Sequence, residues 1–184
     1  MIQTKEEMNT QIATFAGGCF WCTEAIFDQV KGVSSVISGY SGGHVINPSY
    51  REVTGGRTGH AEAIQIEFDP SVITYAELLE IFFKTHDPTT LNRQGADVGP
   101  QYRSAVFYHS EEQKRKTEEI IQALNEAKIW SSPIVTEVTE YSNFYQAEDY
   151  HQEYFENNGQ QPYCRVVIQP KVEKFQKVFK EKLK

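Results

Sequence analysis

The stretch Gly17-Gly18-Cys19-Phe20-Trp21-Cys22 constrains the fold of this chain more than any other. A strand-like run (12–16) precedes it, and a helix-like run (23–30) follows it. Because two consecutive glycines let the backbone turn sharply, the sequence predicts a strand that turns directly into a helix. Cys19 is then expected at or near the first turn of that helix.

A cysteine in that position is a candidate nucleophile. The free N–H groups and the dipole of a helix N-terminus favour a thiolate over a thiol, and the thiolate is the reactive form. Phe20 and Trp21 lie beside Cys19 and can hold a small apolar group, such as a methyl, next to its sulfur. The ordinary alternative is that all three residues belong to the core, which is the commonest location of cysteines and aromatics.

Cys22 completes a Cys-x-x-Cys pair with Cys19. This spacing permits a disulfide and a dithiol–disulfide cycle. It also occurs in zinc sites, which need four ligands and usually a second such pair. The only other cysteine is Cys164, which has no cysteine near it in the sequence. We therefore predict redox-active cysteines and no metal.

Glu62 is the candidate general acid. It has the same strand parity as Ile64, Ile66 and Phe68, so it faces the core if they do. Burial raises the pKa of a carboxyl group and lets it hold a proton near neutral pH. The alternative is that the strand begins after Glu62 and leaves its side chain in solvent.

Other polar residues lie on loops that can reach the same place. The hydroxyl groups of Tyr40, Tyr50 and Tyr102 can donate hydrogen bonds to a polar oxygen. Asp97 precedes Tyr102 on a loop, where an aspartate is commonly a turn former. His60 could pair with Cys19 as in a cysteine hydrolase, although no sequence spacing supports that pair.

Length and charge limit the class of protein. The 184 residues suit one domain, 1–184, with a polar and flexible N-terminus over 1–10. Residues 1–10 lack the apolar core of a secretory signal, and no apolar run reaches membrane-spanning length, so a cytoplasmic protein is expected. No long apolar surface pattern stands out, which favours a monomer. The net charge of −7 argues against nucleic acid or a membrane as the main partner.

The C-terminal end differs from the rest in charge. Segment 171–184 carries six lysines and two glutamates, a local charge of +4. The ordinary interpretation is a solvated helix face, and the alternative is a docking surface for an acidic partner.

Hydrophobic periodicity predicts an α+β fold, with one sheet and helices against one of its faces. The predicted strands are 12–16, 33–38, 63–68, 104–109, 134–138 and 164–168, the predicted helices are 23–30, 75–86, 111–128, 147–157 and a lysine-rich one after Pro170, and long loops lie around 39–59 and 87–99. Long ordered loops in a compact domain usually carry function.

Several of these segments together resemble the A-type peptide methionine sulfoxide reductases. The matching stretches, in order along nearly the whole chain, are 17–24 (GGCFWCTE), 39–43 (GYSGG), 47–53 (NPSYREV), 59–63 (GHAEA), 86–88 (HDP), 101–104 (QYRS) and 145–152 (YQAEDYHQ). The resemblance implies a ferredoxin-like α/β sandwich with long functional loops. It also implies the reduction of methionine S-sulfoxide, free or in proteins, to methionine, with thioredoxin (or dithiothreitol in its place) as reductant and no bound cofactor.

The resemblance also implies roles for individual residues. Cys19 is the nucleophile, and Phe20 and Trp21 hold the methyl group of the substrate. The sulfoxide oxygen is surrounded by Glu62, Tyr50 and Tyr102, and the site is supported by Asp97. A protonated or hydrogen-bonded oxygen leaves more readily, and Cys19 is left as a sulfenic acid.

A second thiol must then condense with Cys19 to form a disulfide that thioredoxin opens by exchange. Both Cys22 and Cys164 are candidates. Members of the family resolve with a cysteine at the first position or with one or two near the C-terminus, and here no cysteine follows Cys164. We favour Cys164 slightly, with Cys22 as the direct alternative or as a relay.

Two other functions fit parts of the sequence. A thioredoxin-like dithiol–disulfide exchanger would use Cys19 and Cys22 and would not need Glu62. A redox-sensing or metal-binding module would turn over no sulfoxide. The residues outside the hexapeptide favour the reductase over both.

Overall fold

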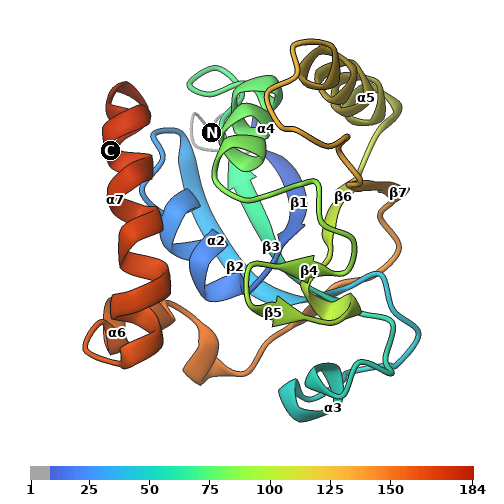
Figure 1. Ribbon diagram of the computed structural model, residues 1–184, viewed down its shortest axis with the longest axis vertical. Helices are drawn as coiled ribbons and strands as arrows, with labels where there is room; N and C mark the ends of the chain where they lie inside the picture. Colours follow the sequence, from blue (N-terminus) through green and yellow to red (C-terminus); the bar gives the residue numbers. More distant parts are fainter. Residues whose placement is uncertain (1–8) are drawn as a thin grey trace, which may run out of the picture.

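The computed structural model describes residues 9–184, so most of the expected flexible N-terminus, 1–10, lies outside the described residues. The central elements follow the order strand, helix, strand, strand, helix, strand: β1 (Gln11–Gly17), α2 (Phe20–Phe27), β2 (Val33–Ser41), β3 (Ala61–Phe68), α4 (Tyr75–Lys84) and β6 (Ser104–Tyr108). The chain colours of Figure 1 follow this order from blue to yellow-green.

The six-stranded sheet has the order β7-β6-β1-β3-β2-β8. Strand β1 pairs antiparallel with β3 and with β6, and β2 pairs antiparallel with β3. The four central strands therefore have the arrangement of a ferredoxin-like fold, which confirms the predicted fold class. Because neighbouring central strands run in opposite directions, the ends of β1 and β2 meet the beginnings of β3 and β6 at one edge of the sheet.

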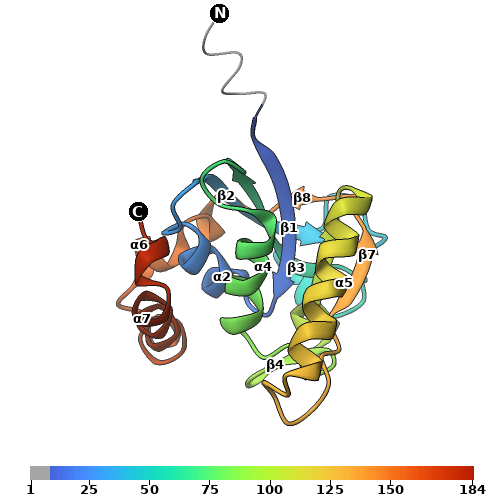
Figure 2. The same cartoon turned by 90° about the horizontal axis from the view of Figure 1, so that it is seen from above.

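One face of the sheet carries the main core and the helices. Phe15 of β1 and Ile64, Ile66 and Phe68 of β3 are fully buried there against α2 and α4. Figure 2 shows the helices gathered on one side of the sheet, with α7 (Gln169–Val178) outside α2. Alternation along β3 buries every second residue on this face, as the period-two pattern predicts.

The opposite face carries a smaller cluster. Its sheet side consists of small residues and one aromatic, namely Ala16, Ala61, Ala63, Ala105 and Phe107. Tyr141 and Phe144 pack against them from the segment that leads to β8 (Tyr145–Gln146). This segment closes the second face without a further helix layer.

The remaining elements extend this framework. They are α3 (Tyr50–Thr54), β4 (Arg93–Gln94), β5 (Asp97–Val98), a 3-10 turn (Pro100–Tyr102), α5 (Glu111–Glu126), β7 (Glu137–Glu140), a 3-10 turn (Asp149–His151), α6 (Tyr154–Asn158), a π-helical turn (Cys164–Ile168) and a final 3-10 turn (Lys180–Lys182). None of the helices in residues 9–184 combines the length and apolar character needed to cross a membrane.

The predicted strand 164–168 is wrong. These residues form the π-helical turn that leads directly into α7. The buried side chains along this stretch are Cys164, Ile168, Val172, Phe175 and Phe179, at intervals of three or four residues. This spacing is helical, and it outweighs the β-branched run that suggested a strand.

The predicted helix 147–157 is also wrong as one element. It is divided into the 3-10 turn and α6, because Glu153 between them has a left-handed backbone (φ 54°). The predicted strand 134–138 begins later, at Glu137, where it pairs in parallel with β6.

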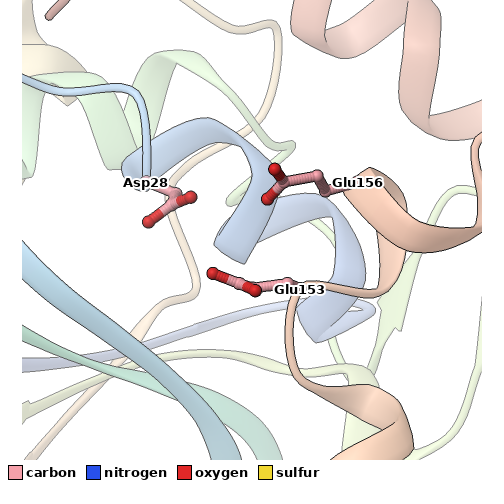
Figure 3. A group of neighbouring side chains, drawn as sticks. All are labelled: Asp28, Glu153 and Glu156. Atoms are coloured by element: carbon pink, nitrogen blue, oxygen red, sulfur yellow. The ribbon is translucent and has the colours of Figure 1, made fainter.

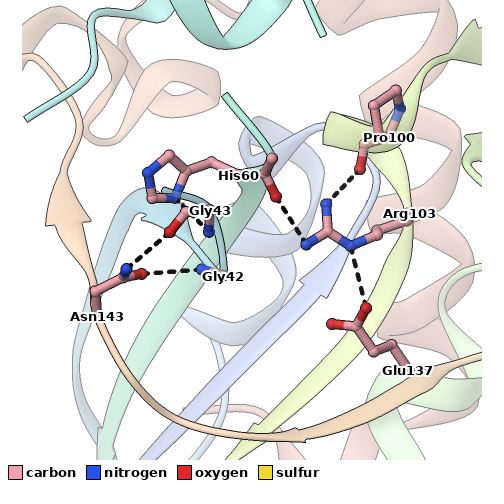
Figure 4. Close-up of polar contacts among 8 residues, drawn as sticks. Gly42, Gly43, His60, Pro100, Arg103, Glu137 and Asn143 are labelled. Atoms are coloured by element: carbon pink, nitrogen blue, oxygen red, sulfur yellow. Dashed lines mark hydrogen bonds and ion pairs between the residues drawn. The ribbon is translucent and has the colours of Figure 1, made fainter. Parts of the chain in front are cut away.

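A polar network fixes the loop after β2 against the beginning of β3 (Figure 4). The side chain of Asn143 accepts a hydrogen bond from the Gly42 N–H and donates one to the Gly43 carbonyl, both at 3.0 Å. The Gly43 N–H donates to His60 Nδ1 at 3.0 Å, and Arg103 donates to the Gly59 carbonyl at 3.0 Å. The network holds the backbone two residues before Glu62.

We expect Gly43→Ala to destabilise the protein by about 1–3 kcal/mol, because overpacking forces the backbone to shift. A Cβ at Gly43 would lie 2.4 Å from both the His60 nitrogen and the Thr58 carbonyl oxygen. The matched control is Gly159→Ala, where φ is −57° and the nearest atom would lie at 3.4 Å. Urea unfolding of both variants tests this, and an equal midpoint for the two would contradict it.

Candidate active site

The site lies where β1 turns into α2. Cys19 is the residue that caps the N-terminus of α2, with extended backbone angles, as predicted for a strand–helix turn. Gly18 has φ +96°, and a Cβ there would lie 2.6 Å from the Gln94 side chain, so the turn requires glycine. The turn leaves Cys19 only 8% exposed.

Glu62 lies beside this turn at the beginning of β3. It is 1% exposed and faces the helix side with Ile64 and Ile66, so the predicted parity is confirmed. The backbone N–H of Phe20 donates to Glu62 Oε1 at 3.2 Å, whereas Oε2 is buried and has no hydrogen-bond partner among residues 9–184. Burial raises the pKa of Glu62 to about 8, although the Phe20 N–H opposes this rise. The carboxyl group is therefore protonated at pH 7, and its Oε2 is the oxygen from which that proton can be donated.

The cysteine pair differs from the prediction in its protonation. Burial raises the pKa of Cys19 well above its ordinary value, and the hydrogen bond with Cys22 and the neighbouring Glu62 carboxyl group raise it further. The prediction of a thiolate from the helix N-terminus is therefore wrong for the protein without ligand, because desolvation outweighs the helix dipole. The Cys19 and Cys22 side chains are hydrogen-bonded to each other, and this bond favours charge on Cys22.

Tyr50 and Tyr102 are half-buried near Glu62 and Cys19, whose charges act on both phenols. Burial raises the pKa of Tyr102 to about 12 and that of Tyr50 above its usual range. Both phenols are therefore neutral hydrogen-bond donors at physiological pH. The tertiary structure brings these two predicted residues together with Cys19 and Glu62.

The two aromatics after Cys19 have different environments. Phe20 is fully buried, with its ring centroid 6.3 Å from that of Tyr50. Trp21 is half-buried and stacks on Tyr154 with ring centroids 3.8 Å apart. The Trp21 indole N–H donates to His151 Nδ1 at 3.0 Å. The indole is thus held from both its face and its edge by the segment after β8.

Asp97 joins the site through a tyrosine that the sequence analysis did not identify. The Tyr163 hydroxyl donates to Asp97 Oδ2 at 2.8 Å, which connects the β4–β5 hairpin to the C-terminal segment. The Tyr163 ring packs edge-on against Trp21 at 5.8 Å. The charges of Cys19 and Cys22 raise the pKa of Tyr163 after the effect of burial, so this phenol lies near both thiols.

Cys164 is fully buried next to Tyr163. Its pKa is raised by burial and then by the charge of Cys22. The three cysteines are all free, and Cys22 is the one that interacts with each of the other two.

Two residues considered from the sequence are engaged elsewhere. His60 accepts a hydrogen bond at Nδ1 from Gly43, and its Nε2 lies 2.7 Å from the Val45 carbonyl, so it forms no pair with Cys19. Tyr40 is buried, and its hydroxyl donates to Glu148 Oε1 at 2.9 Å. The possibility of a Cys–His hydrolase pair is therefore wrong.

Glu24 is a further buried carboxyl group that the sequence analysis did not single out. Burial raises its pKa to about 7, while hydrogen bonds from Ser38 and from the N–H groups of Glu153 and Tyr154 oppose the rise. The Ser38 hydroxyl donates to Glu24 Oε2 at 3.0 Å. Glu24 thus links α2 and β2 to the start of α6, whose Tyr154 supports Trp21. Tyr154 and Tyr163 gave no signal in the sequence, because their contacts with Trp21 cross more than a hundred residues, and His151 appeared only within the matching stretch 145–152.

Three carboxylates gather between the end of α2 and α6 (Figure 3). One oxygen of each of Asp28, Glu153 and Glu156 lies within 4.8 Å of the others. Two of the three residues are exposed, and such acidic groups are common without an ion. We assign no metal to them, and no cysteine belongs to the group.

Known proteins are similar to this chain in sequence and in fold. A family model described as peptide methionine sulfoxide reductase matches residues 11–183. A "Peptide methionine sulfoxide reductase MsrA" of Sulfolobus acidocaldarius is 60% identical over 172 residues, which is 94% of this chain and 97% of the relative. Reduced Mxr1 of Saccharomyces cerevisiae superposes with a TM-score of 0.78 at 37% identity, covering 85% of this chain and 90% of Mxr1. Mxr1 in complex with Trx2 gives 0.56 at 28% identity, covering 80% and 86%.

We expect Glu62→Gln to raise the melting temperature, by an amount that grows as pH rises from 5 to 8. The pKa of Glu62 is about 8 in the folded protein and near 4.5 when unfolded. Between these values the unfolded chain loses the proton and the folded chain keeps it, so Glu62 costs stability with rising pH. The gain at pH 8 should be on the order of 10 °C. Calorimetry at both pH values tests this, and a gain independent of pH would contradict a buried neutral carboxyl.

Proposed function

The chain belongs to the peptide methionine sulfoxide reductase family, and from this premise we propose that Cys19 is the nucleophile that reduces the substrate and Glu62 the acid that activates it. The enzyme converts methionine sulfoxide to methionine, a reaction that repairs oxidised methionine. The single observation that carries the assignment is the protonated Glu62 carboxyl with an unpartnered oxygen beside Cys19.

The substrate binds against aromatic side chains. The Trp21 indole, fixed by Tyr154 and His151, forms the wall that holds the methyl group, and the buried Phe20 ring supports the floor. Asp97, tied to Tyr163, keeps the β4–β5 hairpin closed over the site. A neutral, largely apolar pocket suits the uncharged sulfoxide group.

The oxygen of the sulfoxide receives hydrogen bonds from Glu62, Tyr50 and Tyr102, which are neutral donors. Cys19 sulfur attacks the substrate sulfur while Glu62 gives its proton to the oxygen and takes the Cys19 proton in return. The transient sulfur–sulfur bond and the bond between oxygen and the substrate sulfur then break, as the hydroxyl group bonds to Cys19 sulfur. The products are methionine and Cys19 sulfenic acid. Cys19 remains a thiol in the free enzyme. Its proton transfers only when a substrate oxygen is present to receive the Glu62 proton.

Cys22 is the thiol best placed to condense with the sulfenic acid. Its side chain is hydrogen-bonded to Cys19, and the two residues are one helical turn apart. Condensation releases water and gives a Cys19–Cys22 disulfide. Cys164, which interacts with Cys22, then exchanges to give Cys22–Cys164 and to restore the Cys19 thiol. The cycle thus uses Cys22 as a relay between the other two.

A dithiol protein of the thioredoxin type then reduces the final disulfide. The relative Mxr1 is known in a complex with Trx2, which supports this partner. The electrons come from thiols, so the cycle needs no bound cofactor, and a reducing compartment such as the cytoplasm favours it.

We expect Glu62→Gln to slow sulfenic acid formation about 10²–10⁴-fold, because a general acid contributes a factor of this size. In the wild type this step should fall as pH rises through about 8, where Glu62 loses its proton. The measurement is single-turnover reduction of free methionine sulfoxide. Glu67→Gln, on the opposite parity of β3, is the matched control and should keep the wild-type rate. A dithiol exchanger would be insensitive to Glu62→Gln, and such a result would sink the proposed mechanism.

Mass spectrometry after one turnover without reductant should find a Cys22–Cys164 disulfide in the wild type. The Cys164→Ser variant should stop at Cys19–Cys22. The Cys22→Ser variant should accumulate Cys19 sulfenic acid, because the direct partner of Cys19 is missing. If Cys22→Ser instead forms Cys19–Cys164 at the wild-type rate, Cys164 resolves directly and the relay is wrong.

A further inference from the structure

A groove of about 320 Å³ lies between the C-terminal end of α4 and α7. Its apolar wall includes Trp130, Phe175 and Phe179, and its rim carries Lys84, Lys171 and Lys174. Lys84 and Lys174 are exposed, and Phe175 and Phe179 are buried beneath them. The groove thus offers an apolar floor with three lysines and one carboxylate, that of Asp87, among its lining residues. Lys84 also pairs with Glu80 at 2.9 Å, whereas Lys171 and Lys174 form no ion pair with another residue of the described part of the chain, 9–184.

The charge of the chain makes this groove distinctive. Segment 171–184 carries a local charge of +4 in a chain whose net charge is −7, so the remaining residues carry −11. An acidic protein is repelled by most of this surface and attracted to the α7 side. Such a contrast orients an encounter before contact, because potentials act over about a Debye length, ~8 Å at physiological salt.

Helix α7, which forms one wall of the groove, continues directly from the turn that carries Cys164. The π-helical turn from Cys164 runs directly into α7, so Lys171 follows Cys164 by two turns, about 10 Å along the helix. Lys171 also acts electrostatically on Cys22. A protein interface of ordinary size covers about 800 Å² on each partner. A partner seated in the groove therefore reaches the end of α7 where Cys164 lies.

We propose that this groove, with Lys84, Lys171 and Lys174 on its rim, is the docking surface for the protein that reduces the enzyme's disulfide. The inference rests on the proposed function and adds the recognition chemistry. The partner presents carboxylates around its dithiol and an apolar side chain that enters the groove. Its two thiols become a disulfide as the Cys22–Cys164 disulfide becomes two thiols, so electrons and protons balance. Substrate recognition does not involve this surface, because the sulfoxide is bound by Trp21 and Glu62 at the end of β1.

The test is steady-state turnover with an acidic thioredoxin or with dithiothreitol as reductant. The variant Lys84→Glu/Lys174→Glu reverses two charges on the rim. The matched control, Lys177→Glu/Lys180→Glu, makes the same change in net charge at exposed lysines outside the groove. We expect the rim variant to raise the KM for thioredoxin about tenfold, with unchanged dithiothreitol kinetics, and the control to change it much less.

Each result decides the matter. An equal rise of the thioredoxin KM in both variants would indicate general electrostatic attraction and would overturn the proposal of a specific docking groove. No rise in either variant would overturn it as well. Dithiothreitol needs no docking surface. If the wild type turned over no methionine sulfoxide with dithiothreitol, that result would contradict the proposed function itself. Lys174→Glu alone, at an exposed position, replaces the double variant should the latter unfold, and it must raise the thioredoxin KM at least severalfold.

Discussion

The hydrogen bond from the Phe20 N–H to the Glu62 carboxyl is the interaction on which the site depends. It joins the first turn of α2 to the beginning of β3, two elements separated by more than forty residues. One N–H satisfies one carboxyl oxygen and leaves the other without a partner. The antiparallel order of the central strands makes this meeting possible, because β1 ends where β3 begins. The proposed nucleophile and the proposed acid are therefore neighbours as a consequence of topology.

Burial gives this pair its chemistry and also opposes stability. A carboxyl group in water would be ionised at pH 7, whereas Glu62 keeps its proton because the surrounding site excludes solvent. The same desolvation keeps Cys19 a thiol until substrate arrives. Both groups are thus held in the protonated state from which one proton can move to the sulfoxide oxygen. Groups kept in such states usually cost folding free energy, as expected for a functional site.

The C-terminal third of the chain packs against the aromatic residues that the N-terminal third supplies to the site. His151, Tyr154 and Tyr163 contact Trp21 from three directions, and Glu24 anchors the start of α6 beneath them. Cys164 comes from the same region and leads into the lysine-rich α7. One continuous segment therefore connects the residues proposed for substrate binding and disulfide exchange with the basic surface. This connection favours the reductase over a sensing module, since each part serves one catalytic cycle.

The sequence by itself determined the local features. The glycine pair predicted the turn at Cys19, the period-two pattern predicted the buried face of Glu62, and the helical and strand periods predicted the α+β class. These signals are local, because a turn or a strand face depends on neighbouring residues. Only the tertiary structure decided the helical state of Cys164, the thiol form of Cys19 and the engagement of His60 with Gly43. Each of these depends on packing and desolvation by residues far along the chain, which no local pattern encodes.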